Sequence, residues 1–216
     1  MGCFKKIVLL AGLPRTGSTL LSNILAQNSN MHVESNSALC QVMWDAKVSC
    51  EEHANEQLMG AGKHISFRKH LMESIPQIYY PNAENKVVLD KCRPWVNQFN
   101  INMARTYIDK NIKSVVMVRP MEEVVASYAR IYFKNNGETP YEKLLTHGNH
   151  LLMASFAATL EAAKAKDPSF LFVSYDDLVK NTQAVLNKIY NHIQEDPFVH
   201  NTQQVDQVVF EDDASN

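Results

Sequence analysis

The sequence predicts an α/β protein with a central, mostly parallel sheet flanked by helices in a three-layer, P-loop-like arrangement. Short apolar runs rich in β-branched residues alternate with longer segments of helical periodicity, which indicates βαβ units. The first apolar run ends in a glycine-containing turn that opens a helix. The chain has 216 residues, and no internal repeat or break in composition divides it. We therefore expect one domain over residues 1–216.

Each expected element follows from its apolar pattern. The strands are the β-branched runs at residues 7–11, 87–89, 114–118 and 170–173. The helices have apolar residues three and four positions apart, and they are expected at 18–27, 37–47, 65–78, 95–109, 120–134, 141–165 and 177–193. Residues 48–64 and 135–140 lack such a pattern. The tail after about residue 197 is polar and is expected to pack loosely.

Composition and charge narrow the class of protein. The formal net charge is -2, so the chain as a whole gives no sign of a nucleic-acid or membrane partner. No apolar run approaches the roughly 18 residues of a membrane-spanning helix. The four cysteines form no C-x-x-C pair, which predicts free thiols in a reducing compartment rather than disulfides or zinc. We therefore expect a cytoplasmic protein.

A turn with phosphate-binding character follows the first strand, in the sequence AGLPRTGSTLL. Gly12 and Gly17 bracket four residues, and Thr19 lies two positions past the second glycine. This is the spacing of a P-loop, G-x-x-x-x-G-K-[ST], with Ser18 in place of the lysine. The glycines let the backbone approach an anion, and the helix N-terminus behind them offers N–H groups. The alternative is an ordinary βα turn with a capping hydroxyl.

Three cationic residues follow three of the expected strands. Arg15 lies after the first strand, Lys91 after the second and Arg119 after the third. Because ligands of parallel sheets bind beyond the carboxyl ends of the strands, these cations are expected on one rim. Arg119 considered alone could equally be a solvated or salt-bridged residue. Taken together, the three predict a ligand with several anionic groups.

Two segments together resemble the sulfotransferases that use 3'-phosphoadenylyl sulfate. One is PRTGSTLL, residues 14–21, and the other is VRPMEEVVASYARIYF, residues 118–133. A third segment, VSYDDLVKNTQAVLNKIYNHI, residues 173–193, is similar to the late strand and helix of that family. The resemblance covers most of the chain. It implies a sulfotransferase that takes 3'-phosphoadenylyl sulfate as donor, releases adenosine 3',5'-bisphosphate (PAP) and uses no metal.

The resemblance also implies which residues hold the nucleotide. The family's first loop binds the 5' phosphosulfate, and its third-strand arginine and following-helix serine bind the 3' phosphate. These positions match Arg119 and Ser127 here, while Tyr175 is a looser match to a nucleotide contact. A sulfate donor has no triphosphate tail, so the P-loop lysine that acts on β- and γ-phosphates has no role. The loop residues expected at the donor are Arg15, Thr16, Gly17, Ser18 and Thr19.

Within the family, PRTG with arginine resembles the tyrosylprotein-sulfotransferase branch and its bacterial relatives. That branch implies an acidic catalytic base, which corresponds to Glu34 in MHVESNS, and a catalytic lysine, which corresponds to Lys91. Arg15 is expected to act with Lys91 on the leaving group. His32 is the second candidate base, and Glu34 could instead be a surface or helix-capping carboxylate. The chain lacks the branch's signal anchor and is short, so a Golgi-type enzyme is not expected.

Two other functions fit parts of the sequence. A P-loop kinase or nucleotidase could use Asp90, at the end of KVVLD, to hold Mg²⁺, although the missing lysine speaks against it. A non-catalytic nucleotide-binding or scaffold protein could retain the fold. His147 and His150 lack the companion ligands of a metal site. The acceptor hydroxyl could belong to a tyrosine, a sugar or a small metabolite, and nothing in the sequence decides between them.

Overall fold

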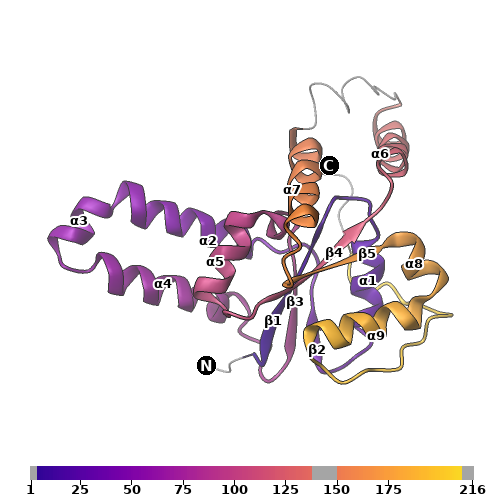
Figure 1. The fold of residues 1–216 in the computed structure, drawn as a ribbon, viewed down its shortest axis with the longest axis horizontal. Coiled ribbons are helices and arrows are strands. Elements are labelled where there is room, and N and C mark those ends of the chain that lie inside the picture. Colours follow the sequence, from indigo (N-terminus) through magenta and orange to yellow (C-terminus); the bar gives the residue numbers. More distant parts are fainter. Residues whose placement is uncertain (1–3, 138–149, 211–216) are drawn as a thin grey trace.

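Five parallel strands form the central sheet of the computed structural model, which describes residues 4–137 and 150–210 (Figure 1). Their order across the sheet is β2-β3-β1-β4-β5. Each pairing of the described strands is parallel, which agrees with the predicted α/β class. The strands are β1 (Lys6–Gly12), β2 (Met31–Val33), β3 (Val87–Lys91), β4 (Lys113–Val118) and β5 (Phe170–Ser174).

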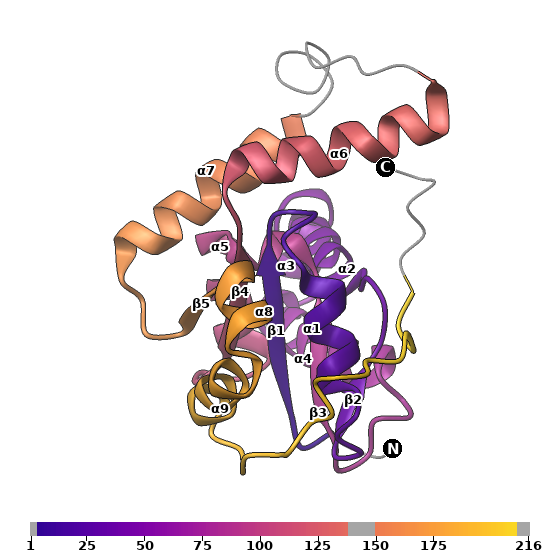
Figure 2. The same cartoon turned by 90° about the vertical axis from the view of Figure 1, so that its right-hand side faces the viewer.

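Helices cover both faces of this sheet and complete the three layers (Figures 1 and 2). One face carries α1 (Ser18–Leu25), α8 (Tyr175–Lys180) and α9 (Thr182–Ile193). The other carries α2 (Leu39–Val48), α4 (His64–Tyr79), the 3-10 turn η2 (Arg93–Val96), α5 (Gln98–Tyr107) and α7 (His150–Ala165). The π-helical turn η1 (Ser49–His53) and α3 (Asn55–Gly60) extend α2 away from the sheet. Helix α6 (Met121–Asn136) follows β4 and lies beyond the carboxyl end of that strand.

The core consists of two apolar layers that share the strands. Ile7, Leu9 and Ala11 of β1 pack with α2, α4 and α5 in one layer, while Val8 and Leu10 pack with α1 and α9 in the other. Side chains of a strand alternate between faces, and here both faces are covered. This is why β1 appears in the sequence as one continuous apolar run.

The element boundaries differ from the predicted ones in a few places. Strand β2 was not predicted, because three residues are too few to show alternation. Residues 48–64, predicted to be irregular, contain η1 and α3. The helix predicted over 177–193 is two helices, α8 and α9, that meet at Asn181. Helix α7 is described from residue 150, so the predicted segment 141–149 lies outside the described residues.

The tail is more closely attached than predicted. Residues 197–210 form no helix or strand, yet they run along α9 and α1 (Figure 2). His200 and Val209 are buried. The Gln27 side chain accepts a hydrogen bond from the Asn201 backbone N–H at 2.8 Å and donates to the Asn201 carbonyl at 3.0 Å. The tail backbone is therefore held against the segment that follows α1, and the polar composition does not indicate a loose segment.

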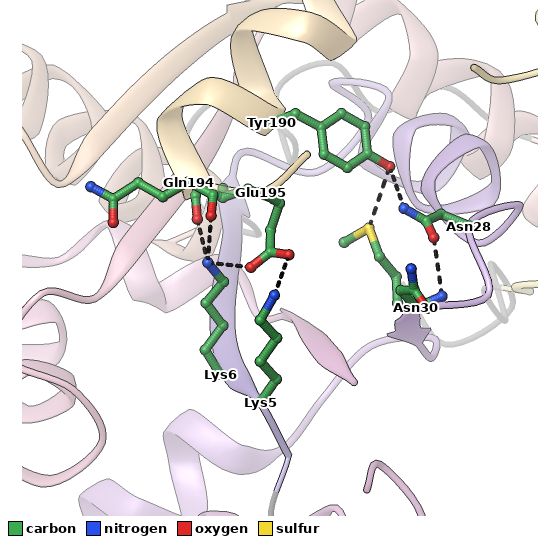
Figure 3. Close-up of polar contacts among 9 residues, drawn as sticks. Lys5, Lys6, Asn28, Asn30, Tyr190, Gln194 and Glu195 are labelled. Carbon is green, nitrogen blue, oxygen red and sulfur yellow. Dashed lines mark hydrogen bonds and ion pairs between the residues drawn. The ribbon is translucent and has the colours of Figure 1, made fainter. Parts of the chain in front are cut away.

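The end of α9, from which the tail leaves, is fixed by polar contacts (Figure 3). The Lys6 ammonium donates to the Ile193 carbonyl at 2.5 Å, and Lys5 pairs with Glu195 at 2.7 Å. Farther up the helix, the Tyr190 hydroxyl accepts a hydrogen bond from the Asn28 side chain at 3.0 Å. These contacts join α9 to the start of β1 and to the segment after α1.

Two whole-chain expectations can be compared with the described residues. No helix within residues 4–137 and 150–210 has both the length and the apolar content needed to cross a lipid bilayer. Cys40, Cys50 and Cys92 are free thiols. Cys3 and the segment 138–149 lie outside the described part of the chain.

Candidate active site

The loop between β1 and α1 is shaped by two glycines in conformations that other residues rarely adopt. Gly12 has φ +125°, and a Cβ atom there would lie 2.4 Å from the carbonyl oxygen of Met117 in the neighbouring strand. Gly17 has φ +90°, and a Cβ atom there would lie 2.5 Å from the Tyr175 ring. Both positions therefore require glycine, for the backbone angle and for the close approach.

Inside this loop, one side chain stabilises the turn, and other groups are available to a ligand. The Thr16 hydroxyl donates to the Leu13 carbonyl at 2.7 Å, and the residue is fully buried. Thr16 therefore supports the turn and does not form a wall of the cavity beside it. Arg15 has φ +63°, a conformation that costs a non-glycine residue about 1 kcal/mol or more. Gly17 caps α1 without a side chain, so the first-turn N–H groups can face an anion.

A polar cavity of about 270 Å³ opens beside this loop. The residues around it come from the loop and α1, from the residue after β4, from α6, from the start of α8 and from the tail. Most of the predicted donor-binding residues meet here. The cavity is lined by Arg15, Gly17, Ser18, Thr19, Leu20, Arg119, Ser127, Tyr175 and Gln207.

Two arginines from different elements are linked at this cavity. The Arg15 Nε atom donates to the Ser127 hydroxyl at 3.2 Å, and the Arg119 guanidinium donates to the Arg15 carbonyl at 3.3 Å. Arg119 also forms an ion pair with Glu123 at 2.7 Å. Its guanidinium carbon lies 4.3 Å from the centroid of the Tyr175 ring. The predicted 3'-phosphate pair and the predicted loop arginine thus belong to one cluster.

Lys91 reaches the cavity indirectly. Its ammonium donates to the Thr19 hydroxyl at 2.9 Å, and Thr19 is one of the lining residues. The lysine itself is only 4% exposed. The end of β3 therefore places a buried cation directly behind the first turn of α1, on the side away from solvent.

The two candidate bases form a pair at the end of β2. His32 Nε2 lies 2.7 Å from Glu34 Oε1. The side chain of Glu34 is 54% exposed and that of His32 is 18% exposed. Neither residue belongs to the lining of the cavity. The extended backbone of β2 puts both side chains on the same side, as strand alternation requires.

Asp90, the candidate metal ligand of the kinase alternative, is fully buried and accepts hydrogen bonds from Ser37, Tyr80 and Trp95. Burial raises its pKa, which the three donors partly offset. These partners lie on the α2 and α4 side of the sheet. The described residues contain no cluster of three or more metal-binding side chains.

Leu20 and Gln207 are cavity residues that the sequence analysis missed. Leu20 appeared as one apolar residue of a helix. Gln207 lies in the tail, far from the loop in sequence, and reaches it because the Asn23 side chain accepts hydrogen bonds from the Val208 and Val209 backbone N–H groups at 2.8 and 2.7 Å. The sequence pattern of the tail contains no signal for this contact.

Comparison with known proteins assigns the chain to a family. A model of the sulfotransferase family matches residues 8–198, which is most of the chain. The chain belongs to the sulfotransferase family. The family predicted by the resemblance is thereby confirmed, and membership decides against the kinase or nucleotidase alternative. The prediction of the tyrosylprotein-sulfotransferase branch within the family stays a prediction.

Solved structures resemble this sulfotransferase in fold. The sulfotransferase domain from the curacin biosynthetic pathway is 20% identical, with a TM-score of 0.60 over 92% of this chain and 76% of that one. The sulfotransferase domain of the Synechococcus PCC 7002 olefin synthase is 19% identical, with a TM-score of 0.60 over 95% and 82%. Mouse sulfotransferase SULT7A1 complexed with PAP is 14% identical, with a TM-score of 0.54 over 91% and 61%. No match was found among curated proteins.

Proposed function

We propose that this sulfotransferase moves the sulfuryl group of 3'-phosphoadenylyl sulfate to an acceptor hydroxyl by in-line displacement. The observation that carries the proposal is one cavity that combines a lysine-free phosphate loop with two arginines and a serine. A solved relative of the same fold is complexed with PAP, the product of that donor. The donor carries anionic groups at both ends, and the cavity offers cationic and N–H groups from two directions.

The proposed binding roles follow from the positions of these groups. The first-turn N–H groups of α1, with Ser18 and Thr19, would hold the 5' phosphosulfate. Arg119 and Ser127 would hold the 3' phosphate. Arg15, which already contacts Ser127, lies between the two ends. Tyr175 packs against Arg119 and would orient its guanidinium toward the ligand.

The proposed chemical step uses groups from three strand ends. The acceptor oxygen forms a bond to sulfur while the bond from sulfur to the 5'-phosphate oxygen breaks. The acceptor proton passes to the Glu34 carboxylate, which His32 contacts at 2.7 Å. Negative charge grows on the leaving phosphate, where Arg15 and Lys91 would stabilise it. The acceptor could be a tyrosine, a sugar or a small metabolite, and no metal is proposed.

Thermal unfolding with different nucleotides tests this function. PAP without metal should raise the melting temperature more than ATP with Mg²⁺, because the cavity offers two phosphate-binding ends and no P-loop lysine. A ligand at one hundred times its dissociation constant adds about 2.7 kcal/mol to the free energy of unfolding. Adenosine 5'-monophosphate is the control that lacks the 3' phosphate. A larger shift with ATP and Mg²⁺ would contradict the proposed donor.

A further inference from the structure

Asp90 is a fully buried carboxylate for which the proposed chemistry gives no role. Its Oδ2 atom accepts hydrogen bonds from the Tyr80 hydroxyl at 2.6 Å and the Ser37 hydroxyl at 2.7 Å, and Oδ1 accepts from the Trp95 indole N–H at 2.5 Å. Burying a carboxylate among neutral donors is costly compared with an apolar side chain. Asp90 directly precedes Lys91 of the proposed active site. A role in supporting that site would explain why a carboxylate is buried at this position.

Ser37 connects this carboxylate to the loop after β2. Its hydroxyl donates to Asp90 and accepts from the Leu39 backbone N–H at 2.9 Å, at the start of α2. Its own backbone N–H donates to the Lys91 carbonyl at 2.8 Å. Ser37 is half-buried, whereas residues 34–36 and 38 are exposed. Ser37 thus anchors an otherwise exposed loop to the end of β3.

The loop that Ser37 anchors begins with the proposed base. Strands β2 and β3 pair in parallel, with His32 opposite Val88 and Val33 opposite Leu89. The pairing ends there, and Glu34 is the first residue beyond β2. It lies near enough to Asp90 for its negative charge to contribute to the raised pKa of that carboxyl, and Lys91 directly follows Asp90. The proposed base and the proposed leaving-group cation are therefore both near the Asp90–Ser37 contact: Glu34 through its charge on Asp90 and Lys91 through its carbonyl, which accepts from the Ser37 N–H.

We propose that Ser37 and Asp90 are positioning residues that hold the Glu34 loop in register with Lys91. This proposal rests on the proposed function. Proton transfer requires the base to lie within hydrogen-bond reach of the acceptor, and a displacement of about 1 Å can cost about 100-fold in rate. The exposed Glu34 side chain contacts His32, but that contact does not fix the backbone of the loop that follows. The hydrogen-bond chain through Ser37 to the buried Asp90 supplies that constraint.

The kinetic test measures release of labelled sulfate from 3'-phosphoadenylyl sulfate to water, a probe that needs no known acceptor. Ser37→Ala should lower kcat by about 10- to 100-fold, while the KM for the donor and the Kd for PAP stay within about twofold of wild type. Ser37→Thr, which keeps the hydroxyl, should restore most of the rate. Ser35→Ala is the matched control in the same loop, and Glu34→Gln sets the size of the full loss, about 10²- to 10⁴-fold.

A double-variant cycle tests whether the two residues act as a unit. Asp90→Asn should lower kcat, and adding Ser37→Ala should lower it little further, because both changes break the same contact. If the fold losses in kcat of the two single variants multiply in the double variant, the two residues act independently, and the proposal that they act as a unit is overturned. Wild-type kcat in Ser37→Ala, or a parallel loss of PAP affinity, would overturn the proposal even if the Asp90 variant does not fold.

Hydrogen exchange separates this proposal from the proposed function. The Leu39 N–H lies in the first turn of α2, where no intrahelical partner protects it, so its protection reports the Ser37 hydroxyl. It should exchange about tenfold faster in Ser37→Ala than in wild type or Ser35→Ala. If the Leu39 amide is protected in the wild type but the wild type does not turn over the donor, the proposed function is contradicted. The Ser37 contact would then be supported by itself. An unprotected wild-type amide would overturn the anchor itself.

Discussion

Arg119 is the residue whose surroundings bear most directly on how the ligand would bind. Its side chain contacts a carboxylate, Glu123, and an aromatic ring, Tyr175, and it donates to the Arg15 carbonyl. The ion pair is partly exposed, so it contributes little to stability by itself. A bound phosphate would compete with Glu123 for the same guanidinium while the aromatic contact stays in place.

Replacement of this arginine should therefore affect one end of the ligand selectively. Arg119→Ala should weaken PAP binding by about 1.5–3 kcal/mol, roughly 10- to 150-fold, which is the value of a charge-assisted contact. Binding of adenosine 5'-monophosphate should change far less. Isothermal calorimetry with both nucleotides measures the difference, and Arg130→Ala is the control because Arg130 is exposed on α6, the helix that follows Arg119. Equal losses for both nucleotides would assign Arg119 to the fold or to another part of the ligand.

At the residue scale, the positions of the candidate residues can be compared with the sequence, while their roles stay predictions. Arg15 follows a strand, and the family resemblance named Ser127 and Tyr175; the three line one cavity. Thr16 instead supports the turn, since its hydroxyl satisfies a loop carbonyl. Gln207 could not be predicted, because its position depends on side-chain hydrogen bonds between segments distant in sequence.

At the scale of elements, the approach of α8 to the loop before α1 is set by a glycine. The ring of Tyr175, the first residue of α8, lies close to Gly17 and 4.3 Å from the Arg119 guanidinium carbon, measured to its centroid. The loop, the residue after β4 and α8 therefore meet at one aromatic ring. Any side chain at position 17 would push the ring away from both partners.

Gly17→Ala should consequently lower both stability and PAP affinity. The substitution adds the cost of a positive φ for alanine, about 1–2 kcal/mol, to a clash with the Tyr175 ring at 2.5 Å. Gly62→Ala is the matched control, because Gly62 also has positive φ but its Cβ would meet nothing within 4 Å. Urea unfolding should show a larger loss for Gly17→Ala, and only that variant should lose PAP affinity. Equal losses in stability would mean that the ring moves aside freely.

The elements themselves were mostly predictable because the core repeats a simple pattern. The four longer strands are covered on both faces and show as apolar runs, while the helices show the spacing of one buried stripe. Strand β2 escaped because its three residues are too few to show alternation. The division between α8 and α9 escaped because the apolar spacing continues past Asn181 although the helix does not.

At the scale of the whole molecule, the tail joins the last helix to the first. Asn23 of α1 accepts from the Val208 and Val209 N–H groups and also donates to the Val209 carbonyl at 3.2 Å, while a second donation, to Thr19 at 3.0 Å, stays within α1. Nearer α9, the buried His200 ring lies 3.0 Å from the Tyr190 hydroxyl. The tail thus contacts the same helix that carries the phosphate loop.

The buried histidine should make the stability of the protein depend on pH. Burial lowers the pKa of His200 below its usual value of 6.5, so the unfolded chain takes up a proton that the folded state resists. The contribution is complete above pH 6.5 and is lost as pH falls, by at most about 1.4 kcal/mol per pH unit.

Urea unfolding at pH 5.5 and 7.5 measures this dependence. His200→Gln keeps a hydrogen-bonding group near Tyr190 but does not titrate, so it should lose less stability than wild type on acidification. Burial also lowers the pKa of His192, but that residue is present in both proteins and its effect cancels in the comparison. The same loss in both proteins would show that His200 remains protonated equally in the folded and unfolded states.

The position of Gln207 in the wall of the cavity has a consequence for biosynthesis. A chain grows from its N-terminus, so the phosphate loop leaves the ribosome long before residue 207 is added. At about 5–20 residues per second, the interval between Gly17 and Gln207 is roughly 10–40 seconds. For that time the nascent protein has a phosphate loop without its last wall. The cavity is therefore complete only after Gln207 has been synthesised.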